Sequence, residues 1–292
     1  MTLPNFIIVG AAKAGTTALY WYLSEHPAVY MSPVKETFYF AYGLDESGRL
    51  LYGDPDVHRF PVKTRAEYEA LFAGAGDARA VGEASPIYLE CPQAADRISA
   101  LIPGARIIAS LRQPVDRAYS DYLMYLRRRG RRLDPAQDLR ADAEWARPDS
   151  RWMQVSRYAD QVRRYVDRFP RGQIHVALFD DLRRDAVGMT QLVYRFVGVD
   201  PAFRPDVDTP HAAGGMPKSR LLERMFASRT LRSALQPLVP TRAANWVRRF
   251  RSRTMSKPPA LPPALRRELT EHFRGDIAET SVLIGRNLDH WL

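Results

Sequence analysis

The feature that most constrains this chain is a short apolar run that meets a glycine-rich loop near its start. Residues 6–9 read Phe-Ile-Ile-Val, and the loop Gly-Ala-Ala-Lys-Ala-Gly-Thr-Thr follows at 10–17. A strand that enters a helix through such a loop directs backbone N–H groups and the positive end of the helix toward one point. The pattern therefore predicts a phosphate-binding turn between a buried strand and a helix.

The spacing of the two loop glycines, Gly10-x4-Gly15, is that of the ATP-binding P-loop, but the residues that follow differ. The ATP loop requires Lys and then Ser or Thr directly after the second glycine, for the phosphates and for Mg²⁺. Here Thr16 follows Gly15, and the lysine, Lys13, lies inside the loop. We therefore expect a phosphate-like anion other than Mg·ATP.

Composition limits the class of protein without choosing the ligand. The chain has 292 residues, of which 46% are hydrophobic, enough for one large domain or two smaller ones. A net charge of +10 favours acidic partners such as nucleotides, anionic glycans, nucleic acid or a membrane surface. A single cysteine excludes an intrachain disulfide framework. Because no run of about 20 apolar residues and no signal-peptide pattern is present, we expect a soluble, cytoplasmic protein.

Strand-like and helix-like segments alternate along the chain, which predicts a parallel sheet covered by helices on both faces. The strand-like segments are 6–9, 29–31, 80–82, 106–111 and 173–179. The helix-like segments are 16–24, 66–72, 91–101, a helix that opens at 114, 156–169, 181–196, 218–235 and a closing helix over 265–277. We expect an α/β protein with a P-loop-like three-layer fold, in which a central parallel sheet is flanked by helices.

We find no convincing linker, and so we expect one domain over residues 1–292. It would carry an irregular insertion at about 41–78, rich in Gly, Asp and Arg, and a Pro- and Arg-rich segment at about 236–263.

The second central strand, 106–111, is followed by a cation. In Mg²⁺-dependent P-loop enzymes an acidic residue usually ends a strand beside the loop and helps to hold the metal. Here Arg112 stands at that place, and Ser120 follows on the helix that Pro114 opens. A guanidinium at the carboxyl end of a central strand suits an anion, so we expect no metal site.

These motifs together resemble the sulfotransferases that use 3′-phosphoadenosine-5′-phosphosulfate (PAPS), and most closely the heparan-sulfate-type branch and its bacterial relatives. Residues 10–17 are similar to the loop that holds the 5′-phosphosulfate, and residues 112–120 to the strand and helix that hold the 3′-phosphate. Residues 35–40, Lys-Glu-Thr-Phe-Tyr-Phe, resemble the segment that bears the catalytic glutamate of that branch. Residues 82–88, Gly-Glu-Ala-Ser-Pro-Ile-Tyr, resemble a loop that lines the acceptor site.

The resemblance implies a donor site and two catalytic residues. PAPS would be the donor and 3′-phosphoadenosine-5′-phosphate (PAP) the product, without a metal. Lys13 would stabilise the departing oxygen, and Glu36 would be the general base. The residues expected to bind the donor are Ala12, Lys13, Ala14, Gly15, Thr16, Thr17, Arg112, Ser120, Lys218 and Arg220.

The acceptor is the part of the reaction that the sequence identifies least. Residues expected near it are Lys35, Glu83, Tyr88 and His211. Ala84 stands where the heparan-sulfate enzymes often carry a lysine, so a glycosaminoglycan acceptor does not follow from the resemblance. We expect sulfation of a hydroxyl, in preference to an amine, on a small-molecule or glycan acceptor: a carbohydrate, a lipid or a secondary metabolite. The sequence leaves the oligomeric state open.

Other interpretations of the same residues remain open on the sequence alone. A P-loop nucleotide kinase or NTPase would use the same loop, although the absence of Gly-Lys-Ser/Thr counts against it. A non-catalytic binder of an anionic polymer would fit the net charge, but no recognised nucleic-acid module is present, and we expect no nucleic-acid partner. Glu36 can also be a plain surface carboxylate. The basic segment 242–257 can be a packed surface helix or a peripheral contact with a membrane or an acceptor.

Overall fold

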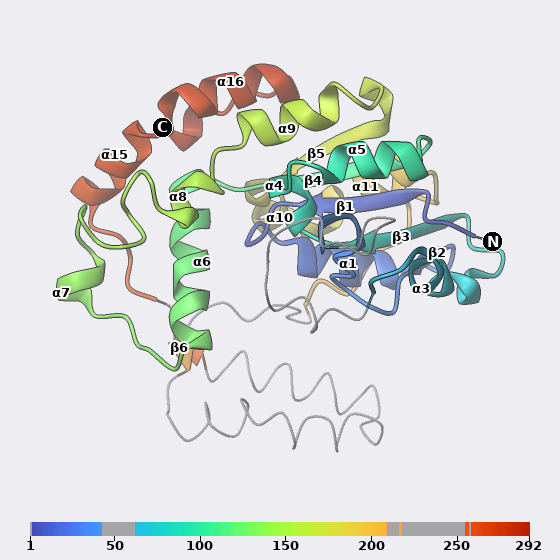
Figure 1. Cartoon of the computed structure of the whole chain (residues 1–292), viewed down its shortest axis with the longest axis horizontal. Helices are drawn as coiled ribbons and strands as arrows, with labels where there is room; N and C mark the ends of the chain where they lie inside the picture. Colours follow the sequence, from blue (N-terminus) through green and yellow to red (C-terminus); the bar gives the residue numbers. More distant parts are fainter. Residues whose placement is uncertain (1, 43–61, 209–215, 218–254, 257) are drawn as a thin grey trace.

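A five-stranded parallel sheet runs through the centre of the computed structural model, with helices on both of its faces (Figure 1). The structure describes residues 2–42, 62–208, 216–217, 255–256 and 258–292. The strand order is β2-β3-β1-β4-β5, so that β1 lies at the centre between β3 and β4. The strands are β1 (Phe6–Gly10), β2 (Val29–Met31), β3 (Ala80–Ala84), β4 (Arg106–Leu111) and β5 (Ile174–Leu178). The predicted α/β class is confirmed.

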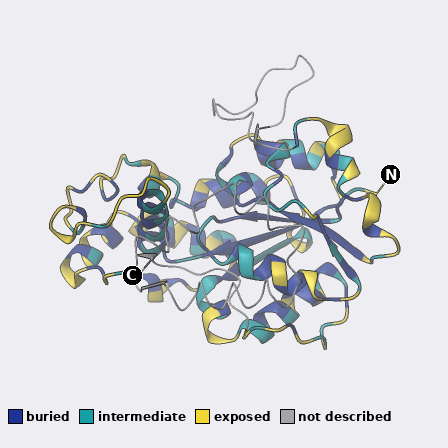
Figure 2. Ribbon diagram, turned by 90° about the horizontal axis from the view of Figure 1, so that it is seen from below, coloured by how far each residue is buried: buried dark blue, intermediate teal, exposed yellow. Residues whose placement is uncertain are grey.

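The strands are buried on both faces because successive side chains of a strand point to opposite sides of the sheet. Phe6 and Ile8 of β1 pack in one apolar cluster, with side chains of α1 (Thr16–Ser24) and α11 (Ala186–Val197). Ile7 and Val9 pack in the other cluster, with side chains of α5 (Ala94–Leu101), α6 (Pro114–Arg128), α9 (Ala159–Val166) and α16 (Arg274–Ile284). Figure 2 shows the result, a buried sheet between helices whose outer sides are exposed.

Shorter elements connect these layers, and α9 and α16 contact each other along one edge of the molecule (Figure 1). No helix within the described ranges is long and apolar enough to span a bilayer. The remaining elements are α2 (Tyr39–Tyr42), α3 (Arg65–Ala70), η2 (Ala73–Ala75), α4 (Ile87–Glu90), α7 (Pro135–Asp138), α8 (Arg151–Gln154), η3 (Arg171–Gln173), α10 (Phe179–Arg184), α15 (Pro263–Glu271), η5 (Asp289–Trp291) and the antiparallel pair β6 (Met216–Pro217) and β7 (Met255–Ser256).

Two helices predicted as continuous are divided in the structure. The segment 181–196 is split between α10 and α11 at Asp185, whose carboxylate accepts a hydrogen bond from the Gly188 N–H at 2.8 Å and so caps a new helix. The closing segment is divided into α15 and α16 at residues 272–273. In both cases the apolar periodicity continues across the break, so periodicity alone did not indicate it.

Parts of two expected segments lie outside the described residues. Of the insertion expected at 41–78, residues 43–61 are not described, whereas 62–78 contain α3 and η2. The segment expected at 236–263 is described only at 255–256 and 258–263, and the predicted helix over 218–235 is not described.

The close packing of β1 against β3 generates a test of the fold. Gly82 of β3 is paired with Phe6 of β1, and a Cβ at Gly82 would overlap the Phe6 ring. We expect Gly82→Ala to lower the free energy of unfolding by about 1–3 kcal/mol, since overpacking forces neighbouring atoms to move. Urea unfolding measures the change. Gly104→Ala is the control, because a Cβ at Gly104 meets no described atom within 4 Å. Equal losses in both variants would contradict the packing argument.

Candidate active site

The candidate site is built where the two central strands, β1 and β4, end side by side. Gly10, the last residue of β1, is paired with Ala109 of β4. The loop after β1 is held to β4 at two points: the Ala11 N–H donates to the Ser110 carbonyl at 2.7 Å, and the Ser110 hydroxyl donates to the Ala14 carbonyl at 2.6 Å. Ser110 is buried and is not among the site residues predicted from the sequence. A lone serine inside the apolar run 106–111 was the signal that could have identified it.

The loop ends at Gly15, which precedes α1 and has a left-handed backbone with φ of 88°. A Cβ at this position would meet Leu182 Cδ2 at 2.5 Å and Phe179 Cδ2 at 3.0 Å, so only glycine fits between the loop and α10. No side chain in the described part of the chain caps the start of α1. The first-turn N–H groups, those of Thr16 and Thr17 among them, therefore have no side-chain cap, and the positive end of the helix can take an anion.

Lys13 lies in the middle of this loop, also with a left-handed backbone, at φ of 71°. Its Nζ is 3.5 Å from the Met124 sulfur on α6. Burial lowers the pKa of Lys13 to about 8; the carboxylate of Asp121 opposes this shift, and the nearby guanidinium of Arg112 adds to it. An ammonium group in such surroundings is stabilised by a bound anion, because the anion replaces the favourable interaction with water that burial removes.

Arg112 follows β4 and meets the same loop. Its Nη1 donates to the Lys13 carbonyl at 3.2 Å, and its guanidinium lies 4.9 Å from the centre of the Phe179 ring. Burial lowers the pKa of Arg112, although a guanidinium remains charged in proteins. The structure therefore brings together the two cations that the sequence predicted at the ends of neighbouring strands. Ser120 lies further along, on α6, and is partly exposed.

The segment that carries Glu36 lies at the end of β3, the strand on the other side of β1. The Glu36 N–H donates to the carbonyl of Ala84, the last residue of β3, at 2.9 Å. The side chain of Glu36 is 41% exposed, and its carboxylate is 2.8 Å from Lys35 Nζ. Glu36 and Phe38 both have left-handed backbones, with φ of 64° and 59°. Three adjacent strand ends thus present a carboxylate, a lysine and an arginine, in that order.

Glu83 and Tyr88 lie behind this segment and not on its surface. Both side chains are fully buried, and the carboxylate of Glu83 accepts hydrogen bonds from four hydroxyl groups. Burial raises the pKa of Glu83. With no exposed surface, neither side chain can contact an acceptor directly in this conformation. The expected site residues His211, Lys218 and Arg220 lie outside the described residues.

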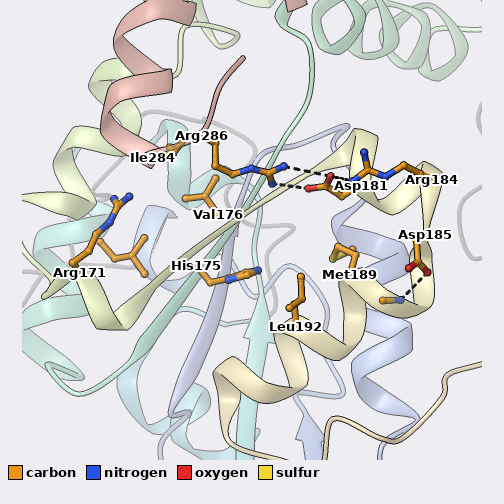
Figure 3. A pocket seen from close by; sticks show the side chains of 12 residues that line it. Arg171, His175, Val176, Asp181, Arg184, Asp185, Met189, Leu192, Ile284 and Arg286 are labelled. Carbon is orange, nitrogen blue, oxygen red and sulfur yellow. Dashed lines mark hydrogen bonds and ion pairs between the residues drawn. The ribbon is translucent and has the colours of Figure 1, made fainter. Parts of the chain in front are cut away.

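A cavity of about 720 Å³ lies apart from these residues, beside β5 at the edge of the sheet (Figure 3). His175, Leu192 and Arg286 are among its lining residues, and none of the predicted site residues is. Its charged groups contact one another: Arg286 Nη1 donates to Asp181 Oδ2 at 2.6 Å, and Arg184 Nη2 to Asp181 Oδ1 at 2.8 Å. The cavity therefore adds nothing to the chemistry at the strand ends.

The arrangement at the strand ends can hold an anion and accept a proton. Two buried or half-buried cations and an uncapped helix start converge on one loop, and a half-exposed carboxylate stands at the next strand end. Across the described ranges, no three His, Cys, Asp or Glu side chains are grouped so as to hold a metal ion.

Comparison with solved structures gives a match over the whole chain. A crystal structure of a sulfotransferase from Alicyclobacillus acidocaldarius is 34% identical, with a TM-score of 0.71, and the match covers 100% of this chain and 99% of that one.

Curated relatives match a shorter segment. The membrane-associated sulfotransferase kil1 of Dictyostelium discoideum is 30% identical over 122 residues, which are 42% of this chain and 23% of that protein. Human bifunctional heparan sulfate N-deacetylase/N-sulfotransferase 2 is 36% identical over 129 residues, 41% of this chain and 13% of that protein. The match thus spans less than a quarter of either relative.

A family model described as "Sulfotransferase family" matches residues 4–204, a span that includes the loop after β1, the Glu36 segment and the end of β4. Because this match covers well over half of the residues, the chain belongs to the sulfotransferase family.

Proposed function

We propose that this protein transfers a sulfuryl group from PAPS to a hydroxyl group of a small-molecule or glycan acceptor. Membership of the sulfotransferase family supports the type of reaction. The observation that carries the donor assignment is the meeting of Lys13 and Arg112 at the ends of β1 and β4. PAPS has a 5′-phosphosulfate and a 3′-phosphate at separate positions on the nucleoside, and so it needs two anion sites.

The residues at the strand ends fit both phosphates. The loop N–H groups and the uncapped start of α1 suit the 5′-phosphate. Arg112 uses Nη1 on the Lys13 carbonyl, and a guanidinium has five N–H donors in a planar fork, so it can also bind the 3′-phosphate with two hydrogen bonds. The hydroxyl of Ser120 would add a third. We assign Lys218 and Arg220 to the same nucleotide as part of the proposal.

Lys13 would act on the leaving group. When the bond between sulfur and the bridging oxygen breaks, negative charge develops on the 5′-phosphate of the departing PAP. A fixed ammonium group beside that oxygen stabilises the charge as it forms and so lowers the barrier. The hydrogen bonds from Ser110 and Arg112 to the loop hold Lys13 in place before the donor binds, so little reorganisation is needed.

Glu36 would act on the acceptor. Its carboxylate takes the hydroxyl proton while the acceptor oxygen forms its bond to sulfur. A positioned general base typically contributes about 10²- to 10⁴-fold to the rate. Lys35, whose Nζ is 2.8 Å from the carboxylate, is assigned in this proposal to the acceptor side as well. His211 remains part of the proposed acceptor site.

The first prediction from the proposed function concerns the donor nucleotide. PAP should raise the melting temperature and ATP should raise it much less, because a ligand at 100 times its Kd stabilises the fold by about 2.7 kcal/mol. Arg112→Ala should remove most of this shift, as measured by differential scanning fluorimetry. Arg106→Ala is the matched control, since Arg106 begins the same strand and donates to the Val197 carbonyl at 2.8 Å, far from the loop. The absence of any shift in the wild type at millimolar PAP would overturn the donor assignment.

The second prediction concerns the general base. Glu36→Gln should leave the PAP-induced shift intact and lower kcat by about 10²- to 10⁴-fold. Turnover is measured as transfer of radiolabelled sulfate from PAPS to acceptors in a cell extract, a screen that also identifies the acceptor. Glu279→Gln is the matched control, because Glu279 is a half-exposed carboxylate that also pairs with a cation, Arg163. An unchanged kcat in Glu36→Gln would mean that another residue acts as the general base.

The third prediction concerns pH. With a pKa of about 8, Lys13 is protonated below pH 8 and loses its charge above it. Since the protonated form stabilises the leaving group, kcat/KM should fall by about tenfold per pH unit above pH 8. Lys13→Arg should be slower at pH 7 but should lack this fall, because a guanidinium remains charged. If the fall occurred at the same pH in both proteins, another group would be responsible.

A further inference from the structure

Glu83 is a buried carboxylate that the proposed reaction does not use directly. It stands next to last in β3, fully buried, and is paired with Ile7 of the central strand. Four hydroxyl groups donate to it. Those of Tyr68 and Tyr88 bind Oε1 at 2.9 and 3.0 Å, and those of Thr37 and Ser85 bind Oε2 at 3.0 and 2.8 Å.

A carboxylate in the core costs the fold stability, so its presence here indicates a role other than stability. A buried carboxylate must be compensated by hydrogen bonds, and a well-packed apolar side chain often stabilises a core as well or better. The four donors come from different parts of the fold: α3, the residue after β3, α4 and the Glu36 segment. The carboxylate therefore joins the Glu36 segment to three other elements.

The hydroxyl groups also bind the backbone of the Glu36 segment. The N–H of Phe38 donates to Ser85 Oγ at 3.3 Å, that of Tyr39 to Thr37 Oγ1 at 3.4 Å and that of Phe40 to the Tyr88 hydroxyl at 3.3 Å. Because the Glu83 oxygens accept the hydroxyl protons, hydroxyl lone pairs remain for these N–H groups. Glu83 thus sets the direction of hydrogen bonds that it does not itself make.

Two residues of the same segment have a backbone conformation that is unfavourable for residues with a Cβ atom. Glu36 and Phe38, on either side of Thr37, have left-handed backbones with φ of 64° and 59°. Such conformations persist only where the surroundings determine them strongly. Thr37, fully buried between the two and bound to Glu83, is the side chain that links this strained backbone to the carboxylate.

We propose that Glu83 is a positioning residue: through the hydroxyl groups of Thr37, Ser85 and Tyr88 it holds residues 36–40 in the backbone conformation that presents Glu36 to the acceptor. This inference rests on the proposed role of Glu36 as the base. It explains why a glutamate in the expected acceptor loop has no solvent-exposed surface: Glu83 would affect the reaction by holding the neighbouring segment in place.

Thr37→Val tests the proposal with the least change in shape, since it replaces one hydroxyl by a methyl group. We expect kcat to fall at least tenfold while the PAP-induced shift in melting temperature stays that of the wild type. Amide hydrogen exchange of a peptide covering residues 36–40 should become at least tenfold faster, and that of a peptide covering 10–17 should not change. Thr37→Ser, which restores the hydroxyl, should recover both kcat and the slow exchange.

Thr190→Val is the matched control. Thr190 is also a fully buried threonine, but its hydroxyl donates to the Ala186 carbonyl at 2.7 Å within α11. It should leave kcat and the exchange of residues 36–40 unchanged. Glu83→Gln is a second test. Its amide N–H groups are donors and face hydroxyl groups that also donate, so this variant should accelerate exchange in the same peptide.

The outcomes separate this inference from the proposed function. Wild-type kcat together with wild-type exchange over 36–40 in Thr37→Val would overturn the positioning role. Faster exchange with an unchanged kcat would also overturn it, since the segment would then be held for stability alone. If the wild type transfers no sulfuryl group to any acceptor, the proposed function fails, whereas unaltered exchange in Thr37→Val would still refute the anchoring of the segment by its hydroxyl.

Discussion

Ser110 binds the loop after β1 at both ends, and the geometry of the candidate site depends on these two hydrogen bonds. Its carbonyl accepts from the Ala11 N–H, and its hydroxyl donates to the Ala14 carbonyl. The loop is thereby held against β4, so that Lys13 and Arg112 come from different strands and still meet. A loop held in this way has its N–H groups oriented before an anion arrives, which is the condition for effective electrostatic stabilisation.

The same geometry brings like charges together. Burial lowers the pKa of Lys13 most, Asp121 acts in the opposite direction, and the guanidinium groups of Arg127 and Arg112 lower it further. Each cation is thus less stable in its charged form than it would be in water. A doubly phosphorylated nucleotide would relieve both effects, because its negative charges would compensate the buried and mutually repelling cations. In our proposal, this balance favours the binding of an anion at the strand ends.

Two carboxylates near the end of β3 have opposite surroundings and, in our proposal, different tasks. Glu36 is half-exposed and paired with Lys35, so it can meet an acceptor and exchange a proton. Glu83 is enclosed by four hydroxyl groups, so it can direct hydrogen bonds but not reach a substrate. The left-handed backbone at Glu36 and Phe38 connects the two, because a conformation of this kind has to be held by neighbouring groups.

Local sequence was sufficient for the sheet, the turn between β1 and α1 and the cation after β4, because apolar runs, glycine spacing and a strand-end arginine act over a few residues. It did not indicate the break at Asp185, where a helix cap interrupts a continuing apolar pattern, or the role of Ser110. Nor did it show that Glu83 is buried, since its hydroxyl partners include Thr37, 46 residues earlier in the chain. The sequence by itself determined which strands and which charges the protein has. Only the tertiary structure decided which carboxylate faces solvent and which lies in the core, because burial depends on contacts between segments that are distant along the chain.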